Sequence, residues 1–324
     1  MAYRIKTTAR LDSEVRRLLL AQIDEAHTLL EARSDVAVAV HESRKSMKRA
    51  RALLRLTRGG LKPVEFRRED QTYRTVGKLL AAERDRFVMT QTVARLTERC
   101  ACDEDRRALL AAGRLFKSPA TNGNEAALDD AKVQQALDLL ATSRRRIRKL
   151  ALRPARIEIL ADGFAQCYAD ARRALKVAHK TNKDDDFHDL RRKLQRHWRH
   201  LQLLSQLWPE LMEVRIASAR HISQLLGDEH DCSVLGLHVA AASAAQISPA
   251  ERDLVIALAR AEQSRLRQEA GPLAARLLVQ APRDVHRFVT DLWPLARRIT
   301  LDARERKEAA STSTTQASKG TIEP

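Results

Sequence analysis

The pattern of hydrophobic and polar positions along the chain is that of helices. Val and Ile rarely alternate with polar residues, so the pattern predicts no β-strand. Ala, Leu and Arg dominate the sequence, and only 10 Gly and 9 Pro interrupt it. We expect an all-α protein, with helices over about 11–33, 36–57, 63–99, 103–116, 250–270 and 282–306 and others between residues 125 and 240.

The second expected helix contains the stretch HESRKSMKRARALLRL, residues 41–56. At about 100° per residue its cations fall on one strip, while Met47, Ala50 and Leu53 take the opposite side. Like charges spaced this closely repel one another, and only Glu42 interrupts them. The strip therefore predicts a binding surface for an anion; it comprises His41, Arg44, Lys45, Lys48, Arg51 and Arg55.

Charge favours polyanionic partners. The chain has 59 Lys+Arg against 42 Asp+Glu, a formal net charge of +17. Nucleic acid, inorganic polyphosphate and an anionic membrane surface are the candidate partners. The four cysteines show no CxxC spacing, which argues against a disulfide framework or a zinc knuckle. No segment reaches about 18 apolar residues and the start has no signal-peptide pattern, so we expect a cytoplasmic protein without membrane insertion.

The cationic strip recurs in the second half of the chain. Residues 188–204, HDLRRKLQRHWRHLQLL, match residues 41–57 at an offset of 147. The helix that follows repeats at an offset of 146, with Arg220 matching Arg74 and LL-x-x-E-x-D matching in both copies. Two motifs agree on the period to within one residue. We therefore predict two homologous helical halves, 1–150 and 151–308, followed by a disordered tail over 309–324.

These motifs resemble the CHAD domain, a family named for conserved histidines and α-helical content. The pattern is H-x-x-R-[KR]-x-x-K-R-x-R on one helix, its second copy near residue 190, and L-L-x-x-x-x-D on the next helix of each half. The resemblance implies two four-helix-bundle-like halves related by a pseudo-twofold axis, with the histidine helices lining a basic groove. It also implies binding of inorganic polyphosphate and a place on polyphosphate granules. Many members carry a triphosphate tunnel metalloenzyme domain marked by E-x-E-x-K, a motif that this chain lacks.

The family motif assigns site residues in both halves. The first half fits fully, whereas Gln195 and Trp198 stand where the second copy should carry a lysine and an arginine. A tyrosine and two arginines precede the second histidine helix, as in other members. The expected polyphosphate contacts are His41, Arg44, Lys45, Lys48, Arg49, Arg51, Arg55, His188, Arg191, Arg192, Arg196 and Arg199, with Arg74, Tyr168, Arg172, Arg173 and Arg220 in support.

Histidines and carboxylates leave alternatives open. His41 and His188 could bind phosphate as double donors, hydrogen-bond within the bundle, or ligate a metal, and we favour phosphate. His197, His200, His221 and His230 are interpreted as packing or surface residues, although a metal site among the histidines of the second half stays an alternative. Four carboxylates could hold a catalytic metal, but ion pairing with Arg74 and Arg220 explains them better; they are Glu83, Asp85, Glu229 and Asp231.

The sequence thus predicts a non-enzymatic polyphosphate-binding protein without catalytic residues, metal or cofactor. Granule-associated proteins are further candidate partners. Two rival functions remain: a nucleic-acid-binding helical protein, which its few aromatic residues do not favour, and an enzyme or accessory that processes phosphoanhydrides.

Overall fold

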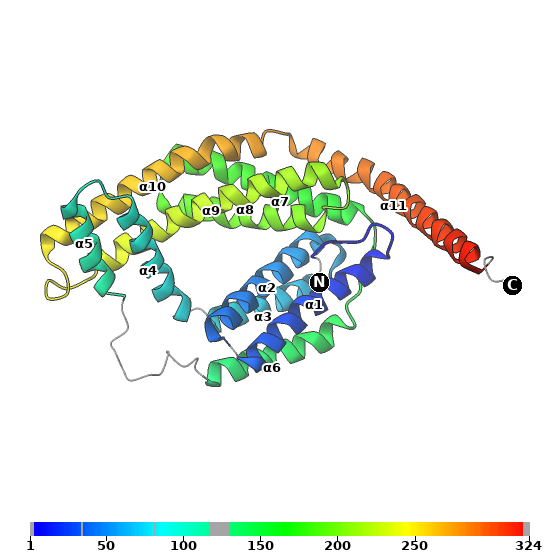
Figure 1. Ribbon diagram of the computed structural model, residues 1–324, viewed down its shortest axis with the longest axis horizontal. Coiled ribbons are helices and arrows are strands. Elements are labelled where there is room, and N and C mark those ends of the chain that lie inside the picture. The colour runs from blue at the N-terminus through cyan, green and yellow to red at the C-terminus, as the bar shows by residue number, and fades with distance from the viewer. Residues whose placement is uncertain (1–2, 34, 81, 117–129, 320–324) are drawn as a thin grey trace.

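The computed structural model of the chain describes residues 3–33, 35–80, 82–116 and 130–319 (Figure 1). Every regular element in these residues is a helix, which confirms the all-α class. The helices are α1 (Leu11–Ala32), α2 (Val36–Leu56), η1 (Arg58–Gly60), α3 (Pro63–Leu79), α4 (Ala82–Glu98), α5 (Asp103–Arg114), α6 (Asp130–Ile147), α7 (Glu158–Thr181), α8 (Asp184–Leu203), α9 (Pro209–Ala240), α10 (Pro249–Leu277) and α11 (Pro282–Lys319).

A first bundle consists of α1, α2, α3 and α6, which pack against one another. Their apolar faces meet in a core that includes Leu19, Leu53, Tyr73 and Leu140, all fully buried. Asp35 starts α2 because its carboxylate accepts a hydrogen bond from the backbone N–H of Val38 at 3.0 Å. The cap fixes where the cationic strip of α2 begins.

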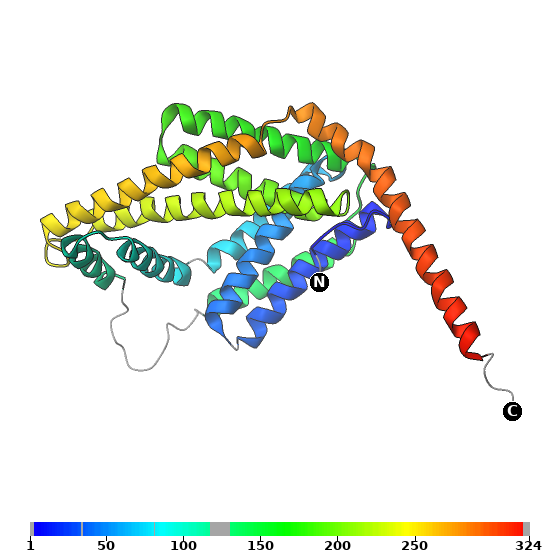
Figure 2. The same cartoon turned by 45° about the horizontal axis from the view of Figure 1, so that its top comes forward.

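A second bundle consists of α7, α8, α9 and α10, and α11 packs on α7 before it extends away from the body (Figures 1 and 2). The two bundles meet where α2 contacts α7 and α8. Gly163 of α7 permits this approach, because a Cβ there would overlap the carbonyl oxygen of Leu56 at the end of α2. His200 of α8 reaches the same helix and places Nε2 2.9 Å from the Ala52 carbonyl oxygen.

The single helix expected over 63–99 is wrong. The helix α3 ends at Leu79 and a new helix, α4, begins at Ala82, whereas the corresponding α9 is continuous. α4 and α5 pack on α9 and α10, where Met89, Leu109, Leu235 and Val255 form a second core. The break lets these two helices bury their apolar faces away from the first bundle. The pseudo-twofold relation and the boundary at residue 150 stay predictions.

The backbone of α11 is helical up to Lys319, where the sequence predicted a disordered tail from residue 309. Ala, Glu, Lys and Arg are frequent between residues 303 and 310, and these are good helix formers. The helix therefore continues through residues that have no hydrophobic face to bury.

Candidate functional site

The two repeated strips lie side by side, because α2 packs against α8. Lys48 of α2 and Gln195 of α8, which are equivalent in the repeat, both line three cavities. We call these the α3-side cavity, the α9-side cavity and the histidine cavity, and the three together the cationic groove. The groove therefore follows the contact between the two histidine helices.

The α3-side cavity, of about 560 Å³, is almost entirely cationic. Its charged lining residues include a single carboxylate, Asp189, which lies 2.9 Å from Arg192 and 2.6 Å from Lys193. Both helices contribute guanidinium groups to one space. The cations lining it are Lys48, Arg51, Arg55, Arg74, Arg192, Arg196 and Arg199.

The α9-side cavity, of about 510 Å³, lies on the other side of the α2–α8 contact. No Asp or Glu is among the residues that line it in the described part of the chain. The neutral side chains there are amides, a serine and Trp198. Its cations and histidine are His41, Arg44, Lys45, Lys48, Arg49, Arg199 and Arg220.

One carboxylate of α3 anchors three arginines of the groove. Asp70 Oδ1 accepts from Arg51 Nε at 3.0 Å, and both of its oxygens accept from Arg55 Nη2, at 3.2 and 3.1 Å. Arg74 Nη2 donates to Oδ2 at 3.4 Å. Burial alone would raise the pKa of Asp70, but these guanidinium groups hold it below the usual value. Sequence reasoning missed Asp70, since its counterpart at the repeat offset of 146 is Ile216.

Arg199 differs from the other cations because it is buried. Its side chain donates from Nη1 to the carbonyl oxygen of Gln195 at 2.6 Å, and its guanidinium lies 5.4 Å from the Trp198 ring centroid. Burial lowers its pKa to about 10, so it keeps its charge at neutral pH. Arg199 lines both the α3-side and the α9-side cavity, so its buried charge makes the electrostatic potential of both cavities more positive.

Three cations of α2, namely Arg44, Lys45 and Arg49, have partners that do not line the groove. Arg44 donates to the carbonyl oxygen of Gly77, and Lys45 lies 2.8 Å from Glu42. Arg49 lies 3.9 Å from Glu25. These contacts hold the side chains at the rim of the groove.

The two motif histidines occupy different places. His41 is exposed in the α9-side cavity, whereas His188 lines the smaller histidine cavity, of about 270 Å³. There its Nδ1 lies 3.1 Å from Nδ1 of His230 on α9. Burial and the adjacent Arg191 lower the pKa of His230 to about 4, and burial followed by Arg192 and Arg191 lowers that of His188.

His230 was interpreted from the sequence as packing or surface, and its pairing with His188 was missed. The position equivalent to His230 at the offset of 146 is Arg84, so the repeat carried no signal for it. His197 and His200 are fully buried, and the packing interpretation is correct for both. The His197 ring stacks on Phe164, with ring centroids 5.1 Å apart.

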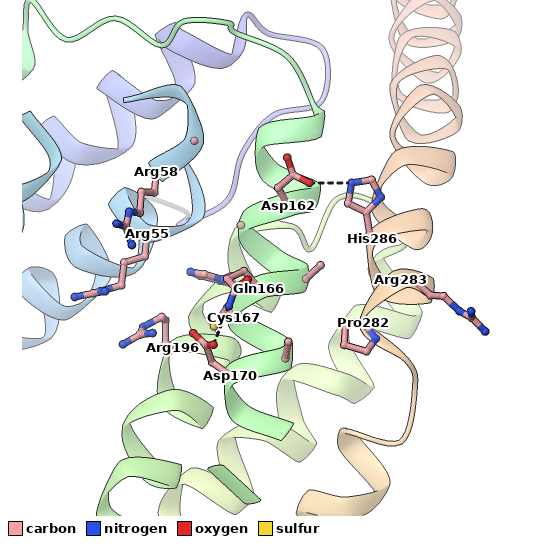
Figure 3. A pocket seen from close by; sticks show the side chains of 15 residues that line it. Arg55, Arg58, Asp162, Gln166, Cys167, Asp170, Arg196, Pro282, Arg283 and His286 are labelled. Carbon is pink, nitrogen blue, oxygen red and sulfur yellow. Dashed lines mark hydrogen bonds and ion pairs between the residues drawn. The ribbon is translucent and has the colours of Figure 1, made fainter. Parts of the chain in front are cut away.

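A fourth cavity, of about 760 Å³, continues from the groove past Arg55 and Arg196. We call it the α7-side cavity. Figure 3 shows Arg55 and Arg196 at one wall and Asp162 and His286 at another. Asp162 Oδ1 lies 3.2 Å from His286 Nε2. Carboxylates also line the α7-side cavity, so its lining is less uniformly cationic than that of the three cavities of the groove.

Comparison with known proteins assigns the family. The model of the CHAD domain matches residues 14–240, which include both histidine helices. The chain belongs to the CHAD domain family. The fold resembles the solved structure of PptA from Streptomyces chartreusis, with a TM-score of 0.53 and 17% identity over 83% of this chain and 100% of that one. No match was found among the curated proteins.

The supporting residues on α7 lie apart from the groove of this CHAD domain. Tyr168 is fully buried, and its ring centroid lies 5.3 Å from that of His197. Arg173 pairs with Asp170 on its own helix. Neither these two nor Arg172 is among the residues that line the cationic groove. Tyr168 belongs to the core, and its part in binding stays a prediction.

Of the four carboxylates considered in the sequence analysis, one lacks the expected ion pair and two have side chains outside the described residues. Buried Glu229 contacts Arg267 at 2.6 Å and Gln263 at 3.2 Å, so its ion pair is structural but does not involve Arg220. The side chains of Glu83 and Asp85 lie outside the described residues. Asp231 lines the histidine cavity. Arg74 pairs with Asp70 instead.

Two further properties concern metals and membranes. Within the described ranges, no three or more His, Cys, Asp or Glu side chains are grouped so that they could hold a metal ion. None of the helices described is both long and apolar enough to cross a bilayer.

Proposed function

We propose that this CHAD domain binds inorganic polyphosphate in the cationic groove and does so without catalysis. The observation that carries the proposal is the convergence of cations from both repeats on one connected surface, with Asp189 as the single carboxylate lining its two larger cavities among the described residues. Membership of the CHAD family, which is associated with polyphosphate, supports the same ligand.

The chemistry of the groove suits a linear chain of phosphates. Polyphosphate has a dense negative charge and no bases to read, so a receptor needs closely spaced cations above all. Arginine binds phosphate oxygens in pairs through its planar fork, and lysine provides a compact point charge. Binding should release condensed counterions, so the affinity should fall steeply as salt rises.

Charge reversal at the shared cations tests the site. Arg44 lines two cavities of the groove and Lys48 lines all three, so Arg44→Glu/Lys48→Glu should abolish binding of long-chain polyphosphate even with the α8 strip intact. Arg145→Glu/Lys149→Glu changes the net charge equally at exposed positions outside the groove and should retain most of the affinity. Equal losses in the two double variants, or independent binding by each strip, would contradict a shared site.

Two measurements separate this proposal from its rivals. Excess polyphosphate should displace bound DNA or RNA, and failure to do so would favour a nucleic-acid-binding function. Incubation with polyphosphate and Mg²⁺ or Mn²⁺ should release no phosphate, whereas release would indicate a phosphoanhydride-processing enzyme.

We also propose that this surface recruits the protein to cytoplasmic polyphosphate granules. A fluorescent fusion of the full chain should colocalise with granules, and Arg44→Glu/Lys48→Glu should disperse it. Granule association that survives this change would point to recruitment by granule-associated proteins instead.

A further inference from the structure

Asp70 lies behind the cations of the α3-side cavity. Its side chain is 10% exposed, against 28% for Arg51 and 46% for Arg74, both of which line the cavity. The carboxylate belongs to α3, while two of its arginines belong to α2. One anion thus connects the cationic strip to the neighbouring helix.

The carboxylate takes only part of the hydrogen-bonding capacity of these arginines. Asp70 accepts from Arg51 Nε and Nη2 and from Nη2 of both Arg55 and Arg74. A guanidinium has five N–H donors in a fixed plane. The remaining donors are therefore held in defined directions, and the side chains that carry them are 24–46% exposed.

Without an internal anion the three guanidinium groups would separate. They lie within 3.4 Å of the same two oxygens, and further positive charge comes from Arg196. Arginine side chains have many rotamers, and a ligand that must immobilise each of them loses affinity through entropy. A carboxylate that fixes them in the free protein removes this cost before the ligand arrives.

We propose that Asp70 is a positioning residue that pre-organises Arg51, Arg55 and Arg74 for phosphate. The inference rests on the proposed function, because it names how the same groove reaches its affinity. The positioning role and simple electrostatics make opposite predictions for the affinity of a variant that lacks this carboxylate. Removing a negative charge next to an anion site should strengthen binding, whereas loss of a positioning carboxylate should weaken it.

Asp24 provides the control, since it is a carboxylate that pairs with an arginine, Arg144, at a place outside the groove. At about 0.3 M salt, where exposed charges are largely screened, Asp24→Asn should bind long-chain polyphosphate as tightly as the wild type. Asp70→Asn should bind about tenfold more weakly, as expected when two or three long side chains lose their order. Asp70→Glu keeps the charge but shifts the carboxylate by one methylene, and should also weaken binding.

The same binding measurement in an Arg51→Gln/Arg55→Gln double variant distinguishes loss of positioning from damage to the fold. There Asp70→Asn should no longer weaken binding, because the arginines that it positions are absent, whereas general damage would cost affinity in both backgrounds. If Asp70→Asn binds polyphosphate as tightly as the wild type, or more tightly, the positioning role is overturned and the proposed function stays in place. A wild-type chain that does not bind polyphosphate overturns both.

Discussion

Protonation of the His188–His230 pair is expected to strengthen polyphosphate binding as the pH falls. The two Nδ1 atoms lie 3.1 Å apart, so at least one ring must be neutral and accept a hydrogen bond from the other. Burial, followed by the charge of Arg191, holds the pKa of His230 near 4 in the free protein. A polyanion in the groove reverses that field, because it neutralises the adjacent cations and accepts hydrogen bonds from a protonated ring.

Charged groups of both signs from α2, α8 and α9 surround the pair. The helix α4 contributes the apolar side chains of Val88 and Met89 to the cavity. The charged groups that face the pair are Arg44 and Lys48 of α2, Asp184, Asp185, Asp189, Arg191 and Arg192 of α8, and Asp231 of α9. Cations predominate at the cavity wall itself, so the free protein keeps the imidazoles neutral at pH 7.

The magnitude follows from proton linkage. If the ligand restores the pKa of His230 from about 4 to the ordinary histidine value of about 6.5, the complex takes up one proton that the free protein does not. Affinity should then rise about tenfold between pH 7.5 and pH 5.5 and level off above pH 7.5. The sign is fixed, because the bound state has the higher pKa and gains stability as protons become available.

Titration of a fluorescent long-chain polyphosphate at constant ionic strength measures this dependence. His230→Asn should flatten the profile between pH 5.5 and 7.5, and His221→Asn, an exposed change on the same helix, should leave it intact. His41→Asn tests the exposed motif histidine separately. A wild-type affinity that is independent of pH, or a full pH dependence in His230→Asn, would refute the reasoning.

Two further predictions concern the contact between the bundles. Gly163→Ala places a methyl group against the carbonyl oxygen of Leu56 and should lower the free energy of unfolding by about 2 kcal/mol, while Gly236→Ala, with no atom within 4 Å, should be neutral or stabilising in the same urea titration. Burial lowers the pKa of His200 to about 3; because the unfolded chain binds a proton below about pH 6.5, the folded state should lose about 2 kcal/mol at this residue between pH 7 and pH 5. His200→Gln should reduce that pH-dependent loss, and an unchanged loss would contradict the assignment.

The sequence alone determined the helical class, the family and the two cationic strips. These features are local: the spacing of charged residues on α2 already places them on one face, and the repeat at an offset of 147 identifies α8 as its partner. All of the cations expected on the strips line the groove.

Only the tertiary structure decided which groups meet across helices. The break after Leu79 depends on the apolar surface of α9 and α10 against which α4 packs. The pattern of hydrophobic residues in 63–99 does not indicate that such a surface is present. Asp70 and His230 have no counterpart in the repeat, and Tyr168 matches the family yet is buried. Their roles depend on how neighbouring helices cross, which brings together residues far apart in sequence.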